Sequence, residues 1–297
     1  MMFVRRIYFI IGLMIITAGC QTTIAQEDIF RPYDASGNSV SLTRKDDPVI
    51  VNNIPRPNLW NDLNVTHKDG ILQSDTIKIA YRLSRQMRDD APLFVYCNGN
   101  SSDIPNHGDL NSYKITSFGD LLQWDYPGYG KSEGRANFED VKLASQTLIN
   151  AVQNMKRRPS QTVIFWGYSL GGFVCADMVS RSDDVAGLIF EAGAPSARAT
   201  ESYLVPKVLR LFIKAKMPKA LRNIDNVKVL DRARHKILVL SGAKDKVLPV
   251  TLSRDLSAQL KKAGHSVTYH EFADADHFSI SWQDEFESAV EAFILGL

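Results

Sequence analysis

The stretch "TVIFWGYSLGGFVCADMV", residues 162–179, decides the fold of this chain. An apolar run typical of a buried strand leads directly into a G-x-S-x-G motif centred on Ser169, and a helical pattern begins at once. Gly167 and Gly171 remove Cβ atoms that would collide where strand and helix cross closely. The helix beginning at Leu170 would direct its positive end at the serine. The stretch predicts a strand–turn–helix that holds the Ser169 hydroxyl above a sheet, in preference to a merely structural turn.

Short apolar runs alternate with helical patterns along the rest of the chain. The runs lie at residues 92–97, 120–126, 162–166, 185–190, 236–240 and 267–272. Helices are expected over residues 138–155, after a cap-like Asn137, and from Thr251 to a stop at Gly264. The alternating segment 77–83 is expected to pair in a hairpin with residues 65–73. This order predicts an α/β fold with a mostly parallel sheet and helices on both faces.

The segment "WDYPGYGKSEG", residues 124–134, contains the Gly-Lys-Ser triplet of nucleotide triphosphatases. A P-loop requires a glycine five residues before the second glycine, so that backbone N–H groups can curl around the phosphates. Five residues before Gly130 stands Asp125, whose carboxylate would repel phosphate. We therefore interpret the segment as a turn that does not bind a nucleotide.

Further motifs accompany "GYSLGG". They are "CNGN" (97–100), "DYPGYGKSEG" (125–134), "SGAKDKVLP" (241–249) and "DADHFS" (274–279). With them the chain resembles the α/β-hydrolase family of serine hydrolases from about residue 65 to its end. In detail it resembles the branch with acyl-protein thioesterase-like and serine-aminopeptidase-like members. The resemblance implies an eight-stranded sheet, an esterase, thioesterase or peptidase activity, and a structural role for the 125–134 turn.

A nucleophilic serine needs a base, and in this fold the catalytic residues follow the order Ser, Asp or Glu, His. Among the histidines after Ser169, His235 and His265 precede strands and His270 lies inside one. His277 follows the end of a strand, where sites of open α/β sheets lie, and it matches the family's histidine loop. We expect His277 to be the base.

The acid and the oxyanion donors are predicted by the same reasoning. We expect Asp245 to be the acid, because it follows a strand and matches the family motif; the rival is Glu191, which directly follows the 185–190 run. Of two backbone donors, one is expected at Leu170 and the other at Asn100, which resembles the donor position. Asn98 stands where many relatives have histidine.

The N-terminus is typical of a bacterial signal peptide. Arg5 and Arg6 precede an apolar stretch at residues 7–16 that is too short for a stable membrane span. The residues up to Cys20 resemble a lipobox, although Thr17 replaces the usual aliphatic residue. We expect residues 1–19 to be removed and Cys20 to be lipidated, with a plain secretory signal or an uncleaved anchor as alternatives.

We expect residues 20–60 to be a tether and irregular lead-in, and residues 61–297 to be one hydrolase domain. A lipid anchor would hold the protein in the bacterial cell envelope, at the outer membrane if there are two membranes; the alternative is a soluble secreted or periplasmic protein. Removal of residues 1–19 leaves 33 basic and 33 acidic side chains, so a nucleic-acid partner is not expected.

The sequence also predicts a lid insertion and the state of two cysteines. A lid is expected at about residues 196–235, where residues 201–223 are apolar and rich in lysine and arginine. We expect a cap helix with a solvated basic face, or a cover over an acyl pocket that also touches anionic lipid. Cys97 and Cys175 are expected as two buried thiols, with a disulfide as the alternative.

Three functions are compatible with these residues. The first is a serine hydrolase that cleaves carboxylic esters or thioesters of a small-molecule or lipid-like acyl substrate, without cofactor or metal. The second is an aminopeptidase-like amide hydrolase. The third is a non-catalytic envelope lipoprotein that uses the fold for binding.

Overall fold

The computed structural model describes residues 20–23, 29–30, 64–74, 77–100, 102–104, 109–203, 213–232 and 234–297. Its strands are β1 (Cys20–Thr23), β2 (Thr66–Gln73), β3 (Lys78–Arg85), β4 (Leu93–Cys97), β5 (Asp120–Trp124), β6 (Val163–Tyr168), β7 (Gly187–Glu191), β8 (Ile213–Lys216), β9 (Lys236–Gly242) and β10 (Ser266–Phe272). Its α-helices are α3 (Asp109–Phe118), α4 (Phe138–Met155), α5 (Gly171–Val179), α6 (Ala197–Thr200), α7 (Asn226–Val229), α8 (Val250–Lys262) and α9 (Phe286–Leu295). Two 3₁₀ helices are η3 (Glu201–Tyr203) and η5 (Ile280–Trp282).

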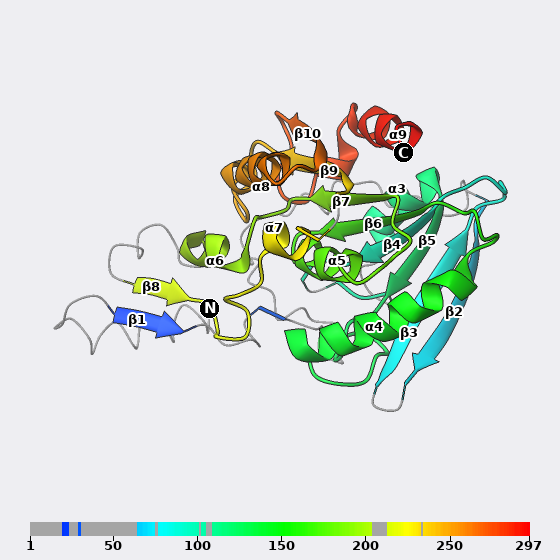
Figure 1. Ribbon diagram of the computed structural model, residues 1–297, viewed down its shortest axis with the longest axis horizontal. Helices are drawn as coiled ribbons and strands as arrows, with labels where there is room; N and C mark the ends of the chain where they lie inside the picture. Colours follow the sequence, from blue (N-terminus) through cyan, green and yellow to red (C-terminus); the bar gives the residue numbers. More distant parts are fainter. Residues whose placement is uncertain are drawn as a thin grey trace.

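An eight-stranded sheet forms the centre of the molecule, with the order β10-β9-β7-β6-β4-β5-β3-β2 (Figure 1). The neighbours from β10 to β5 run parallel, whereas β3 is antiparallel to both β5 and β2. The sheet is therefore mixed, with the predicted parallel strands in its interior and the predicted hairpin at one edge. All residues of β4, β5, β6 and β7 are buried, because helices cover these strands on both faces.

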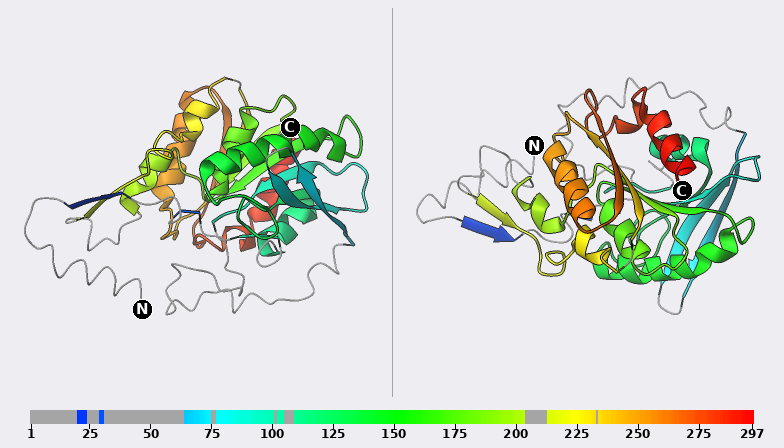
Figure 2. Two further views of the ribbon diagram at one scale, coloured as in Figure 1. Left: turned by 90° about the horizontal axis from the view of Figure 1, so that it is seen from below. Right: turned by 45° about the horizontal axis from the view of Figure 1, so that its top comes forward.

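The two faces of the sheet carry separate apolar clusters. Phe165 of β6 packs into a cluster with residues of α4, α5 and α8, whereas its neighbour Trp166 packs with residues of α3 and α9. The two helix layers lie on opposite sides of the sheet in the views of Figures 1 and 2. Side chains alternate between the faces of a strand, so one apolar run supplies both clusters.

Local signals set the ends of the longer helices. Asn137 caps α4, because its side-chain oxygen accepts a hydrogen bond of 2.8 Å from the Asp140 amide. Gly264 follows α8 with φ of +91°, a left-handed conformation that glycine adopts without strain. Both helix boundaries agree with the sequence prediction.

The cysteine prediction is wrong. Cys97 and Cys175 form a disulfide, with Cα atoms 5.9 Å apart and a sequence separation of 78. Cys97 ends β4, and Cys175 lies on α5, which packs directly over that strand. The packing of α5 on β4 brings the two sulfur atoms together, and the sequence carries no signal for that contact.

The predicted lead-in and lid meet in a second, two-stranded sheet. Strand β1 pairs in parallel with β8, with Cys20 opposite Ile213 and Thr23 opposite Lys216. Phe30, also from the lead-in, is buried in the cluster beneath α4 and α5. The lead-in is thus ordered in two places, and residues 213–216 form a strand where the basic segment was expected to be helical. Residues 204–212, a part of the predicted cap helix, lie outside the described residues.

Two predictions about the N-terminus stay open. Residues 1–19 lie outside the described part of the chain, so signal cleavage and lipidation of Cys20 remain predictions. Within the described ranges, every helix is too short or too polar to cross a bilayer.

Candidate functional site

Ser169 lies at the corner between β6 and α5. Its φ of +53° is a left-handed conformation that is strained for a serine, as expected for a residue that must present its side chain above a sheet. Its amide donates a hydrogen bond of 2.8 Å to the carbonyl oxygen of Glu191 at the end of β7. The strand–turn–helix prediction is correct in every element.

The two glycines around this corner are required for different contacts. A Cβ on Gly167 would lie 2.6 Å from the Gly171 carbonyl oxygen, which is the strand–helix collision that the sequence predicts. A Cβ on Gly171 would lie 2.0 Å from the carbonyl oxygen of Cys97. Gly171 therefore also brings the start of α5 against the end of β4, a strand that is distant in sequence.

A continuous hydrogen-bonded chain joins three of the predicted residues. The Nε2 atom of His277 lies 3.1 Å from Ser169 Oγ, and its Nδ1 atom lies 2.7 Å from Asp245 Oδ2. His277 and Asp245 are both buried, with 4% and 7% of their surfaces exposed. The arrangement can take a proton from the serine and stabilise the imidazolium that forms.

Asp245 is held by the turn that follows β9. Its other oxygen, Oδ1, accepts hydrogen bonds of 2.8 Å from the amides of Val247 and Leu248. The neighbouring Lys244 forms an ion pair of 2.6 Å with Asp274 and not with Asp245. Both oxygens of the carboxylate therefore have donors, and the side chain is fixed in its orientation.

The loop that carries His277 is fastened on both sides. Tyr168, the residue before the serine, donates a hydrogen bond of 2.9 Å from its hydroxyl to the His277 carbonyl oxygen. Asp276 accepts bonds from the Phe278 amide at 3.0 Å and the Ser279 hydroxyl at 2.7 Å. The sequence carries no signal for the role of Tyr168, because position x of G-x-S-x-G tolerates many residues.

Glu191, the rival acid, lies beside this chain and is not part of it. Its carboxyl group accepts a hydrogen bond of 2.9 Å from the indole N–H of Trp166. Burial raises the pKa of Glu191 to about 7, although the hydrogen bond from Trp166 and the charge of His277 act in the opposite direction. The structure therefore places Asp245, and not Glu191, on the imidazole.

The two predicted oxyanion donors lie on loops that adjoin Ser169. Leu170 directly precedes α5, and among the described residues no hydrogen-bond acceptor is found for its amide. Asn100 follows β4 by three residues, after Gly99, where a Cβ would lie 2.7 Å from the ring of Tyr168. Gly99 is thus needed for close packing against the residue that precedes the serine.

The other histidines that the structure describes lie elsewhere. His235 and His265 precede β9 and β10, and His270 lies within β10, as predicted. The rings of His235 and His265 are stacked with their centroids 5.9 Å apart. His67 lies in β2 and bonds to Ser84 at 2.8 Å. Among the described residues no cluster of His, Cys, Asp and Glu could hold a metal ion.

Comparisons with known proteins identify the family and the fold of the chain. In sequence, the chain is 22% identical over 203 residues to an uncharacterised Escherichia coli protein, YfhR, covering 68% of this chain and 69% of that protein. It is 24% identical over 227 residues to the α/β-hydrolase domain-containing protein WAV2 of Arabidopsis thaliana, covering 72% and 73% of the two chains.

Among solved structures, the chain resembles the Pyrococcus furiosus esterase Pf2001, with a TM-score of 0.62 and 16% identity over 80% of this chain and 94% of the esterase. It also resembles a Pyrococcus horikoshii acylaminoacyl peptidase, with a TM-score of 0.56 and 14% identity over 80% of this chain and 41% of the peptidase. At these identities the structural matches establish the α/β-hydrolase fold alone.

The sequence model of the prolyl oligopeptidase family matches residues 123–295, from the strand before the "DYPGYGKSEG" turn to the last helix. The matched region contains Ser169, Asp245 and His277 and more than half of the chain. The predicted α/β-hydrolase fold is confirmed, whereas the predicted thioesterase-like and aminopeptidase-like branch remains a prediction. The protein belongs to the prolyl oligopeptidase family and is a hydrolase of the α/β fold.

Proposed function

We propose that this protein is a serine hydrolase that cleaves carboxylic esters or thioesters through an acyl-enzyme. The observation that carries the proposal is the unbroken hydrogen-bonded chain from Asp245 through His277 to Ser169. A fold does not require these three side chains to meet, whereas nucleophilic catalysis does.

The reaction follows from the positions of the atoms. His277 Nε2 accepts the hydroxyl proton as Ser169 Oγ attacks the acyl carbon, and Asp245 stabilises the imidazolium. The backbone amides of Leu170 and Asn100 bind the oxyanion. The tetrahedral intermediate collapses to the acyl-enzyme as His277 gives the proton to the leaving group. Water then attacks the acyl carbon, with His277 again as base, and Ser169 recovers its proton.

Amide hydrolysis is the second candidate, and the name of the matched family favours it. The same residues can protonate an amine leaving group, and the fold is shared with an acylaminoacyl peptidase. The two candidates differ in the leaving group that the site accepts, and the position of the triad is the same for both.

The test is labelling with a fluorophosphonate probe, which reacts with an activated serine. The wild type should be labelled, Ser169→Ala should not, and Ser288→Ala should be labelled as the wild type, because Ser288 is an exposed serine of α9. Rates on p-nitrophenyl esters and aminoacyl p-nitroanilides then separate ester from amide hydrolysis. A folded wild type that neither reacts with the probe nor turns over either substrate would make the protein a non-catalytic binder.

A further inference from the structure

The turn "WDYPGYGKSEG", residues 124–134, makes a set of contacts that the proposed mechanism does not yet use. Strands β4 and β5 are parallel neighbours, with Tyr96 opposite Gln123. The loops that follow them therefore leave the sheet side by side. One carries Asn98 and Asn100, and the other carries this turn.

Asn98, the first residue after β4, is held by the turn at both its side chain and its main chain. Its amide nitrogen Nδ2 donates a hydrogen bond of 3.0 Å to the Trp124 carbonyl oxygen. Its own carbonyl oxygen accepts a bond of 2.7 Å from the Tyr126 hydroxyl. All three residues are fully buried, and burial raises the pKa of Tyr126 well above its usual value, so its hydroxyl remains a donor.

Asp125 holds the same loop at Ile104. Its buried carboxylate accepts bonds of 2.7 Å from the Ile104 amide and 3.0 Å from the Lys131 amide. Burial raises the pKa of Asp125 to about 6, with these two amides acting in the opposite direction. At neutral pH the carboxylate is ionised and can accept from both N–H groups.

The Gly-Lys-Ser triplet shapes the turn around that carboxylate. Gly130 has φ of +48°, and a Cβ there would lie 2.1 Å from Asp125 Oδ2. Ser132 donates a bond of 2.7 Å to the Asp125 carbonyl oxygen and accepts one of 2.9 Å from the Ala80 amide of β3. The triplet therefore packs around the Asp125 side chain, whereas the same triplet of a P-loop binds a phosphate.

Tyr129 adds a contact to Asn100, the residue that resembles the oxyanion donor. Its hydroxyl donates a hydrogen bond of 3.2 Å to the side-chain oxygen of Asn100. We propose that the turn is a clamp that positions the oxyanion loop, with Asp125, Tyr126 and Tyr129 as positioning residues for the Asn100 amide. This inference rests on the proposed function, because it concerns the same site.

The first test is Tyr126→Phe, which removes one hydroxyl and keeps the ring. Active sites are counted by fluorophosphonate labelling, and kcat and KM for an ester are expressed per labelled site. We expect kcat to fall roughly tenfold with KM within about twofold, because a displaced donor weakens binding of the oxyanion and not of the substrate. A merely structural role would lower the number of active sites or the melting temperature and leave kcat per site unchanged.

The matched control is Tyr269→Phe, which also removes a hydrogen-bonded hydroxyl. Tyr269 lies in β10, four strands from β4, and should keep the wild-type kcat per site. Equal kcat per site in Tyr126→Phe and the wild type would overturn the clamp and leave the proposed function intact. A wild type without labelling and turnover would overturn both.

A double-mutant cycle tests the contact to Asn100. Tyr129→Phe should lower kcat severalfold in the wild type and have no further effect in Asn100→Ala, which keeps the main-chain amide but lacks the side chain that Tyr129 contacts. Independent, multiplicative effects of the two substitutions would show that Tyr129 does not act through Asn100, and would overturn that part of the clamp.

Discussion

At the scale of single residues, two buried carboxyl groups adjoin His277, and their hydrogen-bond partners give them different tasks. Asp245 bonds to the imidazole and to two backbone amides, so its position and that of the ring are fixed together. Glu191 bonds to the indole of Trp166, and its pKa is raised to about 7. Only Asp245 can orient the imidazole tautomer that accepts the proton of Ser169.

Replacement of each acid by its amide should separate these tasks. We expect Asp245→Asn to lower kcat about 10³- to 10⁴-fold, because an amide would hold the wrong histidine tautomer. Glu191→Gln, whose side-chain oxygen can still accept from Trp166, should change kcat by less than about threefold. Steady-state kinetics with one ester measures both, and a larger loss in Glu191→Gln would mean that the acid was wrongly assigned.

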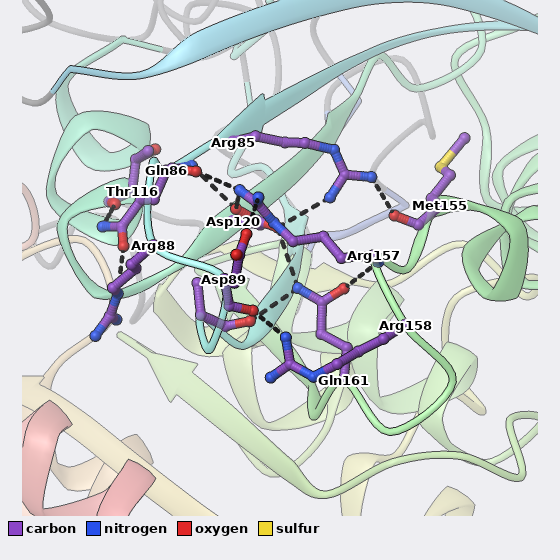
Figure 3. Close-up of polar contacts among 11 residues, drawn as sticks. Arg85, Gln86, Arg88, Asp89, Thr116, Asp120, Met155, Arg157, Arg158 and Gln161 are labelled. Atoms are coloured by element: carbon purple, nitrogen blue, oxygen red, sulfur yellow. Dashed lines mark hydrogen bonds and ion pairs between the residues drawn. The ribbon is translucent and has the colours of Figure 1, made fainter.

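At the scale of the elements, a buried carboxylate fastens the start of β5 to its neighbours (Figure 3). Asp120 bonds to Arg85 at the end of β3 at 3.0 Å and to Arg157 after α4 at 2.6 Å. The Gln86 amide and the Gln161 side chain add bonds of 3.0 and 3.1 Å. Burial would raise the pKa of Asp120, but the hydrogen bonds from Arg157, Gln161 and the Gln86 amide hold it below its usual value.

This network should contribute to stability and not to catalysis, because it lies at the opposite end of β5 from the turn beside the site. Asp120→Asn removes the buried anion that Arg85 and Arg157 share and should lower the free energy of unfolding by about 3 kcal/mol. Asp89→Asn is the matched control, since Asp89 also pairs with Arg157, at 3.6 Å, but is 98% exposed. Its loss should cost less than about 0.5 kcal/mol.

Urea unfolding of both variants at pH 7 measures the difference. Because the pKa of Asp120 is lowered in the folded chain, its contribution is present above the unfolded pKa and is lost as the pH falls through the folded pKa. The gap between Asp120→Asn and the wild type should therefore narrow in acid. A gap that stays constant down to the acid transition would contradict the assignment.

At the scale of the whole molecule, buried titratable groups make the stability depend on pH. Burial raises the pKa of Glu191 from an ordinary value of 4.5 to about 7. Between these values the folded chain binds the proton that the unfolded chain has released, so the stability falls as the pH rises. His235 and His265 act in the opposite direction, because burial lowers their pKa values and protonation below pH 6.5 favours the unfolded chain.

The variant Glu191→Gln isolates the first effect, since the histidines are the same in both proteins. We expect the variant to gain stability relative to the wild type as the pH rises from 5 to 8, with a change of at most about 3 kcal/mol. Thermal unfolding across that range measures the difference. Glu291→Gln, an exposed glutamate of α9, serves as the control and should show no such trend. A difference that does not vary with pH would contradict the raised pKa.

The positions of the candidate site residues could be predicted from the sequence where they depend on local pattern. Turn residues and periodicity predict the corner around Ser169 and the caps at Asn137 and Gly264. The order of the strands predicts the strand ends before Asp245 and His277. The sequence favoured Asp245 as the acid but kept Glu191 as a rival, because both acids follow parallel strands whose carboxyl ends lie at the same edge of the sheet.

The sequence by itself therefore determined the strand–turn–helix, the mostly parallel sheet and the candidate catalytic residues, because each depends on spacing within one element or on strand order. Tertiary structure alone decided which acid meets His277, that Cys97 pairs with Cys175, and that the 124–134 turn holds Asn98 and Asn100. These are contacts between segments far apart in sequence, set by strand register and by the close approach of α5 to β4. No local pattern encodes such distances, since they arise only when the sheet has assembled and the helices have packed on it.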